Sequence, residues 1–80
     1  MNASEKINRA HAAMSTIICA YNEVTDLAKG IGLLDKDGYS IDDDNLVCIA
    51  RQRLAGAIHL LRDFVEEEME NLVPEKEPTK

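Results

Sequence analysis

The chain has few aromatic residues, few cysteines and no long apolar run: its 80 residues include one Phe, two Tyr, two Cys and no Trp. Two cysteines, Cys19 and Cys48, are too few and too far apart for the disulfide framework of a small secreted domain. No apolar run approaches the roughly 18 residues of a membrane span, and the first residues lack the apolar core of a signal peptide. We therefore expect a soluble, cytoplasmic protein with no role in a membrane.

Basic residues are also scarce, with 9 Lys and Arg against 15 Asp and Glu and a net charge of -6. Because phosphate contacts need clustered Lys and Arg, nucleic acid is not the expected partner. An acidic surface keeps a small protein soluble and favours a basic protein partner. A chain of this length makes one domain at most, and its core is marginal when the chain is alone.

The residue patterns that carry catalysis are missing as well. The sequence has no glycine-rich phosphate loop and no Ser-His-Asp pattern, and neither cysteine has a base nearby by sequence, so both are interpreted as inert small side chains. His11 and His59 would reach about the same height in an antiparallel hairpin, but the Glu-x-x-His motif of bundle metal centres is absent. We expect no enzyme, no cofactor and no metal centre.

Apolar residues recur at helical spacing in the first part of the chain. Over residues 3–30 the intervals alternate between three and four, which is a heptad pattern. Gly30 and Gly32 flank Ile31 where a helix end is expected. The pattern predicts a helix from about residue 3 to about residue 30. The residues of its apolar seam are Ile7, Ala10, Met14, Ile17, Tyr21, Val24, Ala28 and Ile31.

A second helix is predicted from about residue 41 to about residue 72. Ser40 followed by Asp43 has the form of a capping box, and Asp42, Asp43 and Asp44 lie where a helix N-terminus favours negative charge. Pro74 stops this helix, and residues 74–80 are predicted to be a disordered tail. The predicted seam runs through Val47, Ala50, Leu54, Ala57, Leu61 and Phe64, and Ile58, Val65 and Leu72 continue it after a shift.

A connection at about residues 31–40 can only fold two such helices back on each other. The predicted fold is an all-α, antiparallel two-helix hairpin over residues 1–73. Its apolar stripes are wider than one helix contact can cover, so we predict that two hairpins pair into a four-helix bundle, with Gly56 allowing close approach. The predicted core and dimer residues are Ile7, Met14, Ile17, Tyr21, Val24, Val47, Leu54, Ile58, Leu61, Phe64 and Val65.

The connection LLDKDGYSIDDDNL holds five aspartates and looks like a calcium-binding EF-hand loop from which two residues have been removed. Asp35 and Asp37 fit the first and third ligand positions, but the fifth, sixth, eighth and twelfth positions do not fit. We interpret the segment as a turn at Asp37-Gly38 followed by a helix cap. Divalent-metal binding through Asp35, Asp37 and Asp42 is an alternative.

The leading hypothesis is a non-enzymatic interaction protein, a homodimeric helical bundle that binds a protein partner and modulates it. Compact acidic proteins of this kind fit roles as inhibitors or adaptors, including accessory proteins of phages and mobile elements. Its acidic groups gather beside the connection and near the end of the second helix. The candidate partner-binding residues are Asp42, Asp43, Asp44, Glu66, Glu67 and Glu70.

A further alternative is a regulator that binds RNA or DNA. The predicted architecture resembles ROP, a dimer of helical hairpins that binds RNA, and the resemblance covers topology without any shared motif. The bases available for such a role are Arg51, Arg53 and Arg62 on the second helix, with Gln52 among them.

Overall fold

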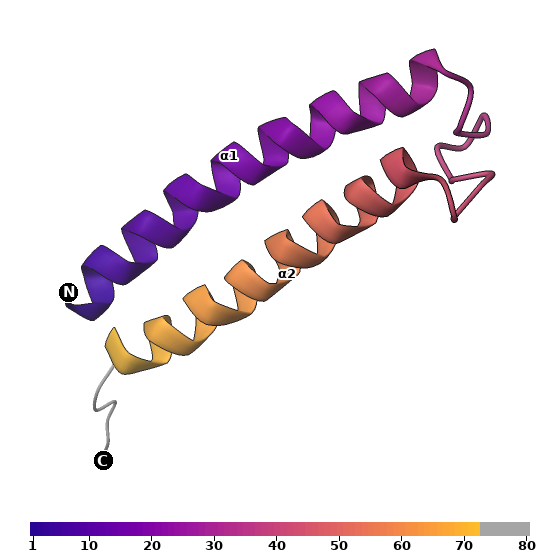
Figure 1. Ribbon diagram of the computed structural model, residues 1–80. Coiled ribbons are helices and arrows are strands. Elements are labelled where there is room, and N and C mark those ends of the chain that lie inside the picture. The colour runs from indigo at the N-terminus through magenta and orange to yellow at the C-terminus, as the bar shows by residue number, and fades with distance from the viewer. Residues whose placement is uncertain (73–80) are drawn as a thin grey trace.

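A computed structural model describes residues 1–72, which form two antiparallel helices packed side by side (Figure 1). Helix α1 spans Ala3–Gly30, helix α2 spans Leu46–Leu72, and residues 31–45 connect them. The molecule measures 56 × 24 × 18 Å, a rod one layer of helices thick. The predicted all-α hairpin is confirmed. The predicted tail over 74–80 lies outside the described residues, and neither described helix is long and apolar enough to cross a membrane.

Both ends of α1 are closed by local hydrogen bonds. The Asn2 side chain accepts from the amide of Glu5 at 2.8 Å, and the Glu5 carboxylate accepts from the amide of Asn2 at 3.1 Å. At the other end, the amide of Leu33 donates to the carbonyl of Ala28 at 2.9 Å, and Gly32 has a φ of 77°. A glycine in the left-handed region is the usual way to close such a helix end. These two caps fix α1 to the range expected from the sequence.

Helix α2 begins at Leu46, later than the predicted start near residue 41. Its cap is Asn45, whose side chain accepts from the amide of Val47 at 2.8 Å. Ser40 does not cap the helix, because its backbone forms an antiparallel bridge with Leu34. Short polar side chains compete with the helix for backbone groups, and the connection has several of them. The predicted Ser40 capping box is therefore wrong.

The three aspartates 42–44 lie before α2 and outside its first turn. The amide of Asn45 donates to the carbonyl of Asp42 at 3.2 Å, and the amide of Asp44 donates to the Asp42 carboxylate at 3.2 Å. Asp42 thus forms a turn with its own neighbours, a conformation that aspartate favours. All three side chains are exposed. The prediction that they occupy the helix N-terminus is corrected to a turn that leads into it.

The core is a narrow strip between the two helices. Ile7, Ala10 and Val65 form one buried cluster, with Met14 packed against it. Ala28 and Cys48 are fully buried nearer the connection. Of the predicted core and dimer residues, Ile7 and Val65 are buried, Phe64 is 37% exposed, and the rest are half-buried: Met14, Ile17, Tyr21, Val24, Val47, Leu54, Ile58 and Leu61.

Helix α2 turns toward α1 a stripe that includes Val65, from the shifted part of the predicted seam, and Cys48, which lies one residue beyond the predicted start of the seam at Val47. Cys48, Val65 and Glu68 are buried, whereas Ala50 is exposed. Val47, Leu54 and Leu61 are half-buried and lie at intervals of seven before Glu68, so this row of the seam lies at the edge of the contact with α1. The contact stripe includes the polar Glu68, so an apolar pattern alone could not identify it.

Gly56, interpreted from the sequence as a point of close packing, is exposed in the hairpin, and a Cβ added there would meet no atom within 4 Å. The Gly56→Ala variant should therefore raise the free energy of unfolding by about 0.5–1 kcal/mol, because glycine costs that much in a helix interior. Urea unfolding measures the change. Gly38→Ala should have the opposite sign, because Gly38 has a φ of 89°. If the Gly56→Ala variant were less stable than the unmodified chain, Gly56 would not be exposed in the hairpin.

Candidate functional site

The connection is a small ordered structure of its own. The amide of Asp35 donates to the carbonyl of Tyr39 at 2.8 Å, and the amide of Ile41 donates to the carbonyl of Leu33 at 2.9 Å. The amide of Gly38 donates to the carbonyl of Asp35 at 3.0 Å. A turn closed by a left-handed glycine is a common hairpin connection. Residues 33–41 therefore form a short β-like hairpin, which we call the loop hairpin, at one end of the rod.

The Asp35 carboxylate is used inside this loop hairpin. It accepts hydrogen bonds from the amides of Asp37 at 2.8 Å and Tyr39 at 3.0 Å. Within residues 1–72, no three His, Cys, Asp or Glu side chains come close enough together to hold a metal ion. The alternative that placed a divalent metal on Asp35, Asp37 and Asp42 gains no support from this geometry. The Asp35 carboxylate closes the turn by accepting these two hydrogen bonds.

Arg51 connects all three parts of the hairpin. Its Nε donates to Thr25 Oγ1 on α1 at 2.9 Å, and its Nη2 donates to the Gly38 carbonyl in the loop hairpin at 3.3 Å. Its guanidinium also lies 5.2 Å from the centre of the Tyr21 ring, close enough for a cation–π interaction. The sequence had suggested Arg51 as a contact for nucleic acid. Its half-buried guanidinium instead holds the loop hairpin against the two helices.

Arg53 and Arg62 do not extend Arg51 into a basic patch. Both are exposed. They are nine positions apart on α2, which is about two and a half helical turns, so they lie on opposite sides of the helix. A surface that follows a nucleic acid backbone needs several bases on one face. Arg62 lies on the same side of α2 as Arg51 but about three turns further along, so the three bases do not form one compact patch.

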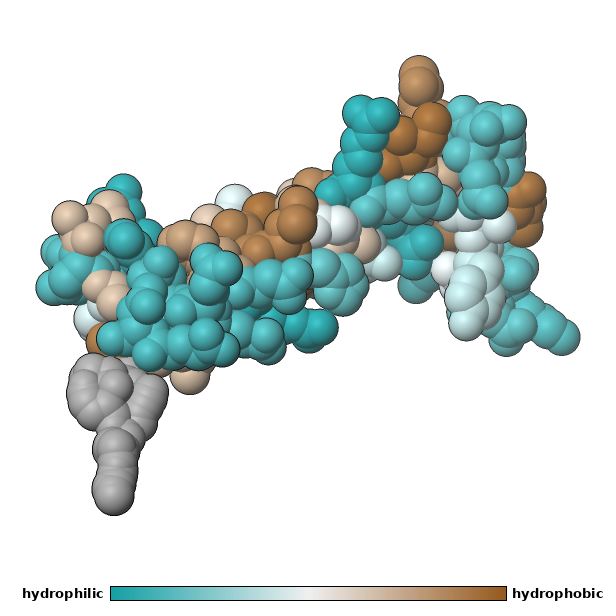
Figure 2. Space-filling view, turned by 90° about the horizontal axis from the view of Figure 1, so that it is seen from below, coloured by the Kyte–Doolittle hydropathy of each residue, from teal (hydrophilic) through white to brown (hydrophobic). Residues whose placement is uncertain are grey.

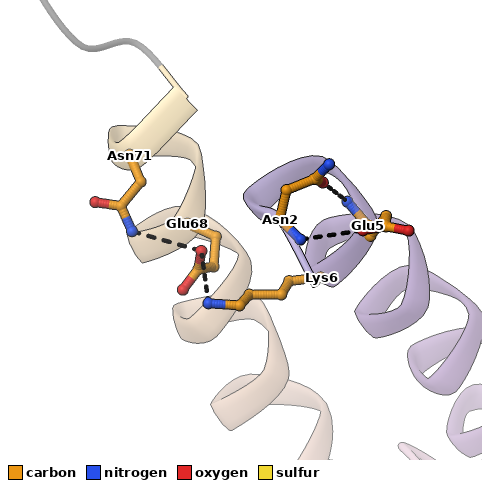
Figure 3. A network of polar contacts seen from close by, with 5 residues as sticks. All are labelled: Asn2, Glu5, Lys6, Glu68 and Asn71. Atoms are coloured by element: carbon orange, nitrogen blue, oxygen red, sulfur yellow. Dashed lines mark hydrogen bonds and ion pairs between the residues drawn. The ribbon is translucent and has the colours of Figure 1, made fainter.

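The acidic end of α2 contains a buried carboxylate that was not among the candidate residues (Figure 3). Glu68 is 8% exposed. Its Oε1 lies 3.8 Å from Lys6 Nζ on α1 and accepts from the Asn71 side-chain amide at 3.4 Å. The sequence signal for this pair is that Lys6 lies opposite the acidic run in an antiparallel hairpin. The pair joins the open ends of the two helices.

The candidate partner-binding carboxylates occur in two separate groups. All of them are exposed, and they lie at opposite ends of α2: Asp42, Asp43 and Asp44, then Glu66, Glu67 and Glu70. At about 1.5 Å per residue, the part of α2 between the two groups is roughly 30 Å long. The structure therefore does not bring the predicted set together into one site.

One side of the hairpin carries an apolar strip, marked at one end by the Lys6–Glu68 pair. Residues seven positions apart lie on the same side of a helix, about two turns along. On α1, the residues that follow Lys6 at intervals of seven are all apolar. On α2, the residues that precede Glu68 at intervals of seven are also all apolar, and Ala57 and Phe64 lie beside this second row. We call this set the apolar flank: Ala13, Ala20, Leu27, Val47, Leu54, Ala57, Leu61 and Phe64. Figure 2 shows hydrophobic side chains along one side of the middle of the rod.

The other side of the hairpin, which we call the polar flank, is marked by Thr25 and Gln52 beside Arg51. Ile18 and His59 lie seven positions from Thr25 and Gln52, on the same side of their helices, and both are exposed. Near the connection the polar flank holds an open cavity of about 610 Å³. The cavity lies between the loop hairpin and the two helices. Its lining residues are Tyr21, Asp37, Gly38, Tyr39, Ser40, Asp43, Arg51 and Gln52.

By its geometry the molecule is a helical hairpin with one apolar flank, one polar flank and acidic groups near both ends. Comparison with known protein families, curated proteins and solved structures found no match for this chain. The two flanks and the acidic ends are the features from which its function is inferred.

Proposed function

We propose that this chain is a non-enzymatic interaction protein that forms a homodimeric four-helix bundle and binds a basic protein partner. The observation that carries the proposal is the apolar flank. Within residues 1–72 the hairpin is one layer thick and no second layer covers this side, where Leu27 is 51% exposed. A contiguous apolar surface of this kind is typical of an interface.

A second copy of the chain suits the apolar flank well. In a dimer with twofold symmetry the same patch contributes to both sides of the interface, so it must be complementary to itself. The flank has both large and small members, with Leu54, Leu61 and Phe64 as candidates to fill the spaces beside Ala13 and Ala20. Such alternation lets helices pack by ridges and grooves. The product is a bundle whose added core lies between the apolar flanks of the two hairpins.

A basic protein partner is supported by the charge of the chain. The net charge is -6, and the exposed carboxylates 42–44 lie in the connection, away from the middle of the apolar flank. Opposite charge speeds association and adds specificity. We propose that partner binding through these groups inhibits or adapts the partner, in the cytoplasm, where the free thiols of Cys19 and Cys48 stay reduced.

The solution mass tests the homodimer. Light scattering should give about twice the mass of the chain, with the same value in the presence of calcium and of a chelator. A monomeric mass would contradict the role of the apolar flank. A mass that changes with calcium would return the loop aspartates to consideration as a metal site.

A further inference from the structure

We propose that the cavity on the polar flank binds a lysine or arginine side chain of the partner protein. This inference rests on the proposed function, since it names the chemical group by which a basic partner is recognised. The cavity of about 610 Å³ falls in the range of roughly 300–1,000 Å³ that is usual for ligand pockets. It can take a long side chain and is much larger than a site for a single ion.

Two tyrosines give the cavity its aromatic walls. Tyr39, at the loop hairpin, is 72% exposed, while Tyr21 on α1 is half-buried. A tyrosine ring attracts an ammonium or guanidinium group placed over its face. The Tyr21 ring already lies against the guanidinium of Arg51. The Tyr39 ring is the one that an incoming cation can reach.

The carboxylates of the cavity are available for a cation. In the described part of the chain, the ion pair is that of Lys6 with Glu68, and neither Asp37 nor Asp43 forms one. Asp43 accepts a long hydrogen bond from Gln52 at 3.5 Å. A charged donor forms shorter and stronger bonds with a carboxylate than a neutral amide does. A partner ammonium or guanidinium would therefore gain contacts with Asp37 and Asp43 that Gln52 does not supply.

Arg51 does not give the cavity the character of an anion site. Its Nε and Nη2 are directed to Thr25 and to the Gly38 carbonyl, and its charge lies over the Tyr21 ring. With two carboxylates and one guanidinium, the lining carries a net charge of -1. The balance favours a single positive group as occupant.

The walls of the cavity are held in place before a ligand arrives. The Asp35 carboxylate fixes the amides of Asp37 and Tyr39, and Arg51 fixes the loop hairpin to α1. A preorganised site loses less entropy on binding. Because the cavity lies on the polar flank, a dimer formed through the apolar flank leaves it open to a partner.

An NMR titration of the isotope-labelled full chain tests this inference. The probes are N-acetyl-arginine amide, the neutral N-acetyl-glutamine amide and the anionic N-acetyl-glutamate amide. We expect saturable shifts of the amides of Tyr39, Asp43 and Gln52 with the arginine probe at millimolar concentration. The Tyr39→Ala and Asp43→Asn variants should each weaken binding about fivefold, the loss expected for one cation–π contact or one charged hydrogen bond. An equal response to the glutamine or glutamate probe, or no saturation, would overturn the assignment.

The control variant is Asp26→Asn, which removes the same charge from an exposed position on α1 that does not line the cavity. It should keep the affinity of the unmodified chain, and a loss equal to that of Asp43→Asn would show a general effect of net charge and overturn the site. Light scattering on the same samples separates the two proposals. A dimer without arginine binding removes the cavity site and keeps the dimer, whereas a monomer with saturable binding does the reverse.

Discussion

Replacing Phe64 by lysine should convert the proposed dimer into a monomer. Phe64 lies on the apolar flank and is 37% exposed in the single hairpin, so the hairpin itself can hold a lysine there with its ammonium in water. In the bundle the same ammonium would be buried without a partner, which costs several kcal/mol per subunit. Light scattering should show the mass fall to that of one chain, while circular dichroism shows that the helices remain.

The matched control is Ile18→Lys. Ile18 is 43% exposed, close to the exposure of Phe64, and it lies on the polar flank. Its replacement adds the same charge to the other side of the hairpin and should leave the mass of the dimer unchanged. If Ile18→Lys dissociates the protein as readily as Phe64→Lys does, or if neither variant dissociates it, the interface is not the apolar flank.

Replacing Arg51 by alanine should lower the free energy of unfolding by about 2 kcal/mol. The change removes the hydrogen bonds to Thr25 and Gly38 and the contact with Tyr21. A hydrogen bond from a charged group contributes about 1.5–3 kcal/mol, and the partial exposure of Arg51 places the sum near the lower end of that range. For a chain of this size the melting temperature should fall by roughly 10 °C.

Arg53→Ala supplies the comparison for Arg51→Ala. Arg53 is exposed on the same helix, so its loss should change the free energy of unfolding by less than about 0.5 kcal/mol. Both melting curves must be recorded at one protein concentration, because the stability of a dimer depends on it. Equal losses for the two variants would mean that Arg51 does not hold the loop hairpin in place.

Helix α1 could be predicted from local signals alone. Its seam follows a regular heptad from Ile7 onward, and glycines mark its end, so the spacing of side chains and the cap both favour the same limits. The antiparallel arrangement followed from the short connection between two helices of similar length. These features depend on residues that are close together in the sequence.

The start of α2 and its contact stripe could not be predicted in the same way. Ser40 and Asn45 are both good helix caps, and the choice between them depends on the bridge that pairs Ser40 with Leu34. The stripe facing α1 includes Arg51 and Glu68, polar residues that are satisfied by Thr25 and Lys6 from the other helix. Hydrophobic periodicity predicts that polar residues such as these face the solvent.

The cavity also could not be predicted from the sequence. Its lining combines Tyr21 from α1, Tyr39 and Asp43 from the connection and Gln52 from α2. The sequence did single out the aspartates, as metal ligands, as helix caps and, for Asp43, as a candidate contact for a protein partner, but it did not place Asp43 beside a tyrosine ring. Their contribution to a cation site depends on where the loop hairpin places Tyr39, which no local pattern reveals.

The loop hairpin also affects how two chains of the proposed dimer could exchange subunits. Opening it into a continuous helix, as domain swapping would require, breaks the Leu34–Ser40 bridge and the hydrogen bond between Arg51 and Gly38. It would also place Gly32 and Gly38, which now have positive φ angles, inside a helix where glycine is unfavourable. We therefore expect the proposed dimer to form and separate with each hairpin closed, so that mixed subunits should exchange without unfolding.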